Sequence, residues 1–124
     1  VILRPDETPK IRQSDIIHSK RNIFPIVTEK GKLLGILYSE RLFSILLGEE
    51  EGIDQPFHKL AEIPTDLVKI HEEDMESVML KMKKDDVWIL PVIDKDGNYL
   101  GFVSKSSVFN KYRALLMRQG HYLE

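Results

Sequence analysis

The apolar residues of the chain fall into two similar series, one in each half. Each series opens with an apolar-Pro-aliphatic-aliphatic run, continues through a polar turn that contains Gly, and ends in a second apolar run that one Gly interrupts. The two series span residues 24–39 and 90–107, and their equivalent Pro and Gly residues lie 66 positions apart, as Pro25 and Pro91 do. A gapless internal repeat of this kind predicts two copies of one structural unit.

The segment before each series predicts a strand or an apolar lead-in, followed by a helix. In the second copy, Val68 and Ile70 alternate as in a strand, and Asp74 is placed to cap a helix. Four apolar residues then follow at helical spacing: Met75, Val78, Met79 and Met82. In the first copy, a helix over residues 9–19 is expected, with Thr8 as its cap.

The two apolar runs of each series are expected to pair as antiparallel strands. Gly35 and Gly101 interrupt the second strand and mark either a bulge or a place where another backbone or a ligand comes close, and we expect a side chain there to strike the opposing backbone. A helix with an apolar face closes each copy. Each copy therefore reads strand, helix, strand, strand, helix, and the predicted fold class is α/β (α+β). With residues 48–52 as a solvated linker, the first repeat spans residues 1–58 and the second spans residues 59–124.

Size and charge narrow the choice of function. Each copy is marginal alone, so the 124 residues, 42% of them hydrophobic, are expected to fold as one module. A net charge of −2, from 18 basic and 20 acidic residues mixed along the chain, gives no footprint for nucleic acid. The sequence has no cysteine for disulfides or thiolate metal sites, and no apolar run near the ~20 residues of a membrane helix. A start at Val1 rather than Met favours a piece of a longer protein.

The sequence contains no residue pattern that is typical of a catalytic site or a metal site. The four histidines are far apart and show no i, i+4 pairing: His18, His58, His71 and His121. There is no Ser-His-acid or Gly-x-Ser-x-Gly pattern, and the pair Glu72 and Glu73 reads as charge near a helix N-terminus. We therefore expect no catalytic residues, no metal and no enzyme activity.

Two copies of strand-helix-strand-strand-helix, each with the Pro-containing run and a Gly-apolar-apolar run before a helix, resemble a tandem CBS-domain pair, also called a Bateman module. The resemblance covers nearly the whole chain. It implies two pseudo-symmetric repeats packed through their sheets, with clefts in which family members often hold adenine nucleotides. It also implies a homodimer, for which the helix faces ending at Leu47 and Leu116 are candidate surfaces.

A narrower resemblance concerns the host protein. Residues 18–25, 86–92, 101–106 and 109–113 are similar to the C-terminal cytosolic CBS pairs of some bacterial CLC-type chloride channels and transporters. This implies a membrane-embedded transport domain in the same polypeptide, with the module on the cytoplasmic side of the cell membrane, where it modulates transport. The alternatives are a regulatory CBS pair of another host, whether an enzyme or another transporter, and a constitutive dimerisation module without ligand.

The segment after each interrupting Gly carries the candidate ligand site. In nucleotide-binding CBS repeats it reads Gly-apolar-apolar-Thr/Ser-x-x-Asp, with the hydroxyl on phosphate and the carboxylate on ribose, at a helix N-terminus with free amides. The second copy keeps the hydroxyl as Ser104 but has Ser107 at the Asp position. The first copy departs further, with Tyr38 and Arg41 at these two positions.

Other groups nearby would compensate in part for the missing carboxylates. Lys105 and Arg41 favour phosphate, and Trp88 or Tyr38 would stack on a base, so the candidate ligand is an adenine nucleotide such as ATP, ADP or AMP. Each assignment has a simpler alternative. The serines would cap the last helix, Arg41 would form salt bridges, and Trp88 would lie in the core because its period-two neighbours are apolar.

Overall fold

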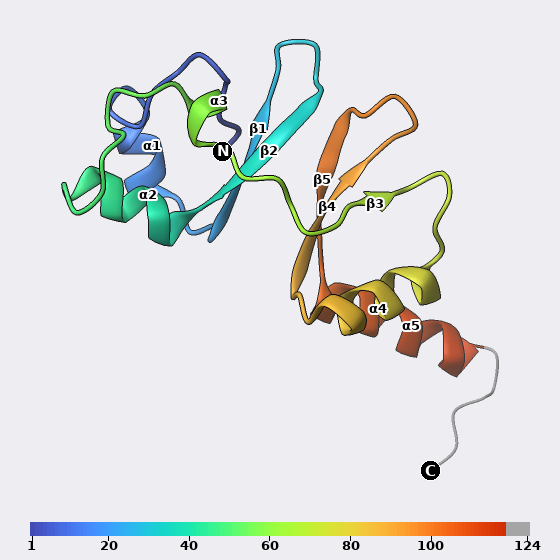
Figure 1. The fold of residues 1–124 in the computed structure, drawn as a ribbon. Coiled ribbons are helices and arrows are strands. Elements are labelled where there is room, and N and C mark those ends of the chain that lie inside the picture. Colours follow the sequence, from blue (N-terminus) through green and yellow to red (C-terminus); the bar gives the residue numbers. More distant parts are fainter. Residues whose placement is uncertain (119–124) are drawn as a thin grey trace. The chain divides into compact units, whose positions relative to one another are not determined.

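The computed structural model describes residues 1–118, and the chain divides into two compact units, Val1–Pro64 and the part from Thr65 onward (Figure 1). Each unit has its own small sheet, its own helices and its own core. The repeat boundaries expected from the sequence, 1–58 and 59–124, stay a prediction. No helix among the described residues is long and apolar enough to span a membrane.

The first unit is built on a two-stranded antiparallel hairpin. Its elements are α1 (Gln13–His18), β1 (Ile23–Val27), β2 (Leu33–Tyr38), α2 (Ser39–Leu46) and α3 (Phe57–Leu60). Two isolated bridges extend the hairpin on either side, since Leu3 pairs parallel to Ile26 and Glu62 pairs antiparallel to Ile36. The backbone leading into α1 and the backbone following α3 therefore both lie against the hairpin.

The second unit has a three-stranded sheet in the order β3-β4-β5. Its elements are β3 (Val68–Lys69), α4 (Met75–Asp85), β4 (Ile89–Ile93), β5 (Tyr99–Ser104) and α5 (Lys105–Arg118). Strand β3 runs parallel to β4, and β4 runs antiparallel to β5. The register shift between Val92 and Ile93 repeats the shift between Ile26 and Val27 of the first unit, 66 positions earlier. The predicted mixed α and β fold with two similar repeats is confirmed.

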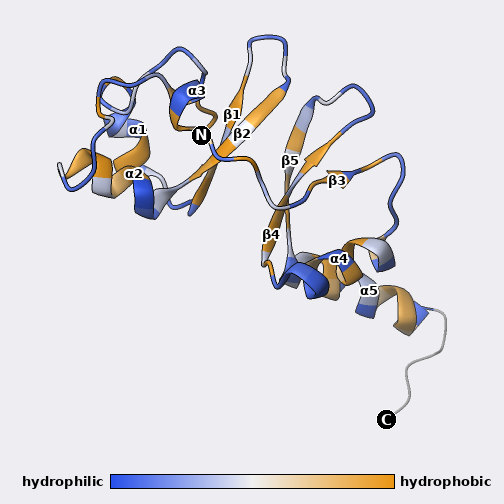
Figure 2. Ribbon diagram, in the orientation of Figure 1, coloured by the Kyte–Doolittle hydropathy of each residue, from blue (hydrophilic) through white to orange (hydrophobic). Residues whose placement is uncertain are grey.

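The cores also repeat at the same interval. Four pairs of residues that lie 66 positions apart are buried in both units: Ile16 and Met82, Phe24 and Leu90, Pro25 and Pro91, and Leu42 and Val108. The helices thus pack one apolar face on their own sheet, and Figure 2 shows apolar colour on the strands and helices of each unit. Burial of one such side chain contributes about 1.5–3 kcal/mol. The first core is larger, and α3 adds Phe57 and Leu60 to it.

The helix starts were predicted with mixed success. Asp74 caps α4 as expected, since its Oδ1 accepts from the Ser77 amide at 2.8 Å. Helix α1, however, begins only at Gln13, so the predicted start at residue 9 was wrong. The amide of Lys10 donates to the Ile53 carbonyl at 3.1 Å, which draws residues 8–12 into turns instead of a helix.

The two interrupting glycines are required for different reasons. At Gly35 the backbone of a neighbouring segment does come close, because a Cβ there would lie 2.9 Å from the Glu62 oxygen and 3.0 Å from the Ala61 Cβ. At Gly101 the predicted clash was wrong, because no described atom lies within 4 Å of such a Cβ. Gly101 instead has φ +144°, a conformation that other residues resist.

Candidate ligand-binding site

The start of α5 carries a cluster of serine hydroxyls. Ser104 is the last residue of β5, and its Oγ accepts from the Ser107 amide at 3.2 Å, which makes Ser104 the N-cap of α5. The Ser104 Oγ also lies 2.8 Å from the Ser107 Oγ. The capping alternative for Ser104 is therefore confirmed, and a role of these hydroxyls toward a ligand stays a prediction.

Lys105 and Trp88 are paired at the same end of the helix. The Lys105 amide donates to the Trp88 carbonyl at 2.7 Å, and the Lys105 Nζ lies 4.7 Å from the centre of the Trp88 ring. The amides of Lys105 and Ser107 are thus both occupied, so the expected free amides at this helix start are not found at these two residues.

Trp88 does not lie in the core, and this prediction was wrong. The side chain is 70% exposed. Helix α4 ends at Asp85, its C-cap Asp86 has a positive φ of 50°, and the next residue, Val87, packs against the core. Strand β4 begins only at Ile89, so Trp88 lies before the strand and its burial does not follow that of Leu90. One consequence is that an indole face stands at the surface next to Lys105.

Beside the serine cluster, the second unit has a groove between its sheet and its helices. The groove has a volume of about 470 Å³, within the usual range for small-molecule sites. Its apolar lining consists of Val68, Ile70, Met75, Val78, Val92, Phe102, Val103 and Val108. Its polar residues are Glu73, Asp74, Ser107 and Lys111. We call this the second-unit groove.

The polar residues of the second-unit groove differ in what they already bind. Asp74 is engaged as the cap of α4. Lys111 forms no ion pair within residues 1–118, and it lies one helical turn after Ser107 on α5. The groove therefore presents one hydroxyl and one uncommitted cation along the same helix.

Glu73 is held in place by Lys81. The Lys81 Nζ donates to Glu73 Oε1 and, at 2.7 Å, to the Leu67 carbonyl, while Asp66 lies 3.6 Å away. Burial lowers the pKa of Lys81, but the hydrogen bond to Glu73 and the attraction of Glu73 and Asp66 outweigh it and leave that pKa raised. The second oxygen of Glu73, Oε2, is buried and has no hydrogen-bond partner among the described residues. A carboxylate oxygen with unused acceptor capacity thus belongs to a residue that lines the groove.

The two candidate residues of the first unit stand in a different environment. Tyr38 ends β2 and is 45% exposed. Arg41 Nε donates to Glu50 at 2.9 Å, and its Nη1 donates to the Leu60 carbonyl at 2.8 Å and to Glu62 at 3.3 Å. The hydrogen bond to Glu50 is the largest contribution that raises the pKa of Arg41. Arg41 therefore forms salt bridges, as the alternative to phosphate binding predicted.

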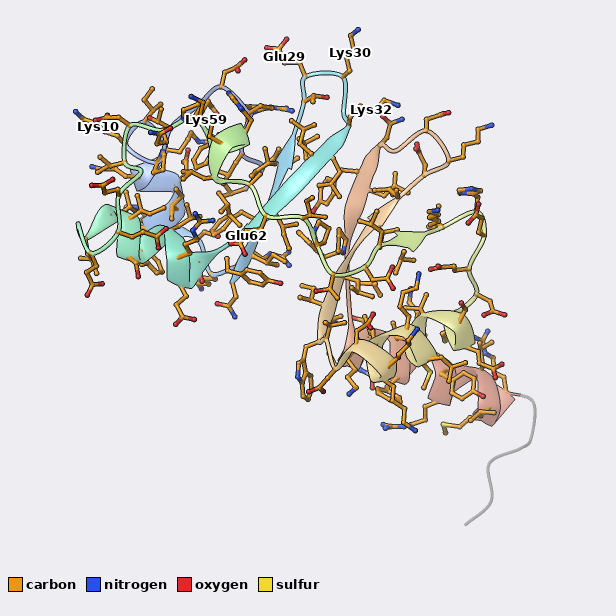
Figure 3. The ribbon with its side chains drawn as sticks, in the orientation of Figure 1. Lys10, Glu29, Lys30, Lys32, Lys59 and Glu62 are labelled. Carbon is orange, nitrogen blue, oxygen red and sulfur yellow. The ribbon has the colours of Figure 1, made fainter. Side chains whose placement is uncertain are left out.

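The surface around Arg41 is acidic. A shallow pocket of about 390 Å³ is lined by Tyr38, Arg41, Ser44 and three carboxylates: Glu40, Glu50 and Glu62. Figure 3 labels Glu62 on the segment that leaves α3. Two of the three carboxylates already neutralise the one guanidinium, so this pocket disfavours a phosphate.

The structure thus brings Trp88, Ser104, Lys105 and Ser107 together at the start of α5 and places the other two candidates at the start of α2. Sequence reasoning missed Glu73 and Lys111. The i, i+4 spacing from Ser107 was an available signal for Lys111, whereas the orientation of Glu73 depends on Lys81. Among residues 1–118, no three His, Asp or Glu side chains gather to hold a metal ion, and His121 lies outside these residues.

Comparison with known proteins agrees with this architecture. Residues 61–114 match the family model of the CBS domain. The CBS pair of the putative Mg²⁺ transporter SO5017 from Shewanella oneidensis MR-1 has a TM-score of 0.74 at 19% identity, over 92% of this chain and 64% of that chain. The structure of CbpB in complex with c-di-AMP has a TM-score of 0.75 at 15% identity, over 98% of this chain and 83% of that chain.

A curated relative supplies one further comparison. Homoserine O-acetyltransferase of Methanococcus vannielii is 26% identical over 107 residues, which is 85% of this chain and 21% of the relative. The chain therefore spans about a fifth of the length of that relative. Taken with the solved structures, the chain has the fold of a tandem CBS pair, as the sequence predicted.

Proposed function

We propose that this CBS pair is a non-catalytic regulatory module that binds an adenine nucleotide in the second-unit groove. The observation that carries the proposal is the combination of an apolar groove of about 470 Å³ with Ser107 and the uncommitted Lys111 on one helix. Apolar walls suit a purine ring, an ammonium group suits a phosphate, and a hydroxyl suits the ribose. The complex of CbpB with c-di-AMP supports adenine as the base.

The polar groups of the groove favour a particular orientation of the nucleotide. Lys111 would hold the phosphate, because its ammonium group forms no ion pair within residues 1–118. Ser107 would hydrogen-bond to the ribose hydroxyls, because it stands where nucleotide-binding CBS repeats carry the ribose carboxylate.

Regulation follows if the nucleotide favours one state of the host protein. A ligand shifts an equilibrium only by the difference between its affinities for the two states. We propose a CLC-type chloride channel or transporter as host, with the module on the cytoplasmic side of the membrane. The resemblance of residues 86–92 and 101–106 supports this host, and the CBS pair of a putative Mg²⁺ transporter shows the same fold in a transport protein.

A different host is favoured by one comparison. The match to homoserine O-acetyltransferase covers 85% of this chain, so a CBS pair attached to an enzyme is the second candidate. In either case we propose a regulatory and non-catalytic role for the module itself. The proposal for the second-unit groove does not depend on the host.

Self-association is the other function that a specific surface favours. Helices α4 and α5 border an apolar depression of about 430 Å³ that includes Met79, Leu80, Phe109 and Tyr112. Leu80 is 61% exposed, which is unusual for a leucine beside other apolar residues. A second copy would cover this face by isologous pairing. Sedimentation at tens of micromolar should show twice the 14.4 kDa mass, and a single 14.4 kDa species would exclude this function for the isolated chain.

Calorimetric titration with AMP, ADP and ATP tests the nucleotide proposal. We expect binding by at least one of the three, and a roughly tenfold weaker affinity for Lys111→Met, which equals a loss of about 1.4 kcal/mol. Lys95→Met is the matched control, because Lys95 is an exposed lysine in the β4–β5 turn and does not line the groove. Absence of binding by all three nucleotides would overturn the proposal, as would an equal loss in both variants.

A further inference from the structure

The turn that joins β4 to β5 contains the single Asp-Gly dipeptide of the sequence, Asp96–Gly97 (Figure 1). Asp96 is exposed, and Gly97 has φ +84°, a conformation that Gly adopts readily. Because Gly has no side chain, nothing on it hinders the approach of the Asp96 carboxyl carbon to the Gly97 nitrogen. The sequence therefore singles out Asp96 among the aspartates for reaction with its own backbone.

Asp94 holds this turn closed. The Gly97 amide donates to the Asp94 carbonyl at 3.1 Å, and the Asp94 amide donates to the Asn98 carbonyl at 3.0 Å. The Asp94 Oδ1 accepts from the amides of Asp96 and Asn98 at 2.9 Å each. The nitrogen that would react is thus engaged in a turn that the Asp94 side chain stabilises.

The first unit has the same turn without the reactive dipeptide. At the counterpart position, 66 residues earlier, the Gly31 amide donates to the Thr28 carbonyl at 2.9 Å, and Gly31 has φ +93°. The Thr28 Oγ1 accepts from the Lys32 amide at 3.0 Å. Lys30 stands at the position of Asp96. Because lysine has no carboxyl group, this turn is an internal control for the chemistry of the other.

We propose that Asp96–Gly97 is a modification site, at which Asp96 converts to isoaspartate when the β4–β5 turn opens. The Gly97 nitrogen bonds to the Asp96 Cγ, and the amide proton leaves with the hydroxyl of the protonated carboxyl group as water. Water then adds to the cyclic succinimide. Cleavage at Cγ restores aspartate, whereas cleavage at the main-chain carbonyl carbon leaves isoaspartate. The water released is the water returned, so no oxidant, reductant or other reactant is required.

The turn controls how often this reaction can start. The Gly97 nitrogen must lose its proton, so its hydrogen bond to the Asp94 carbonyl has to break first. The rate is therefore set by the fraction of chains in which the turn is open. The product stays open, because isoaspartate adds a carbon atom to the main chain next to the pair formed by Ile93 and Tyr99.

Storage of the chain near neutral pH at physiological temperature, followed by peptide mapping, tests the site. We expect isoaspartate to accumulate at residue 96, several-fold faster in Asp94→Ala and not in Asp96→Glu, because a glutamate would have to form a larger ring. Asp96→Asn provides the isoaspartate standard, since ammonia leaves in place of water. Absence of isoaspartate at residue 96 in Asp94→Ala would overturn the proposal.

Two control variants separate the turn from general loss of stability. Thr28→Ala removes the side-chain acceptor of the counterpart turn and should leave the rate at residue 96 unchanged. Asp94→Asn keeps an acceptor oxygen and should react like the wild type. Equal acceleration by Thr28→Ala and Asp94→Ala would overturn control by the turn. If Asp94→Ala fails to fold, the wild type decides: the folded chain should react several-fold more slowly than the urea-unfolded chain, and equal rates would overturn the same point.

Hydrogen exchange of the separated isoaspartate form tests the structural effect. The Asp94 amide should exchange several-fold faster than in the unmodified chain, because its bond to the Asn98 carbonyl is lost. The Thr28 amide, which donates to the Lys32 carbonyl at 2.9 Å in the first unit, should exchange at an unchanged rate. An Asp94 amide as protected as before would overturn the opening of the turn.

Discussion

The ammonium group of Lys105 lies 4.7 Å from the centre of the Trp88 ring, and the backbone amide of Lys105 donates to the Trp88 carbonyl. The end of the α4–β4 connection is thus joined to the start of α5 by two contacts of different kinds. A backbone hydrogen bond fixes the position of the residue, and a cation–π contact fixes the direction of its side chain. Both orient the helix that carries Ser107 and Lys111.

The cation–π contact should contribute a small, measurable stability. For an exposed pair we expect a coupling energy of about 0.5–1 kcal/mol in a double-mutant cycle with Trp88→Leu and Lys105→Met. Urea unfolding of the four proteins measures it. A parallel cycle with Lys95→Met in place of Lys105→Met is the control, and coupling of the same size in both cycles would contradict the contact.

The two interrupting glycines should respond differently to substitution. Gly35→Ala forces a Cβ against the backbone of Glu62, so we expect a loss of about 1–3 kcal/mol together with faster exchange of the Glu62 amide. Gly101→Ala meets open space but has an unfavourable φ, which costs on the order of 1–3 kcal/mol and leaves the Glu62 amide unaffected. Thermal unfolding and hydrogen exchange separate the two mechanisms. If Gly35→Ala melted like the surface variant Lys95→Ala, the close approach would be disproved.

The internal repeat predicted the main features of the fold, whereas features that depend on a single residue or on a short segment were not predicted. The 66-residue interval predicted two copies of one structural unit, and buried residues such as Ile16 and Met82 lie at that interval in the structure. The position of Trp88 depends on a left-handed residue at Asp86, which ends the helix and interrupts the alternation. Helix α3 was missed because Phe57–Leu60 is too short for any hydrophobic period to appear.

The candidate site was predicted in part for the same reason. Ser104 and Ser107 belong to a local motif, and the structure brings them together. Glu73 precedes α4, Lys111 lies on α5, and both line the second-unit groove. Tertiary packing brings them together, and no local sequence pattern predicts that packing.

The Lys81 ion pair should make stability depend on alkaline pH. Its pKa is raised above the ordinary value of 10.5, so its contribution is fully present below that value and is lost as pH rises through the higher pKa of the folded state. We expect the stability difference between wild type and Lys81→Met to shrink as pH rises above 10.5, as measured by urea midpoints. Lys84→Met, at an exposed position of the same helix, is the control. A difference that stays constant to alkaline pH would contradict the ion pair's role.

Restoring the missing carboxylate should tighten nucleotide binding. Ser107→Asp places an acceptor beside the groove at the position where nucleotide-binding CBS repeats carry Asp, and a hydrogen bond from a ribose hydroxyl to a charged group contributes roughly 1.5–3 kcal/mol. At the N-terminus of α5 the new charge is also favoured by the helix dipole, so the variant should fold at least as well as the wild type.

For the wild type, affinity should depend chiefly on Lys111 and fall as salt rises, because exposed charges are screened within about 8 Å at physiological ionic strength. Calorimetry of wild type, Ser107→Asp and Ser107→Asn with AMP at two salt concentrations measures both effects, with Asn as the neutral control of similar size. A gain with Asn equal to that with Asp, or an affinity that does not change with salt, would place the bound nucleotide away from Ser107 and Lys111.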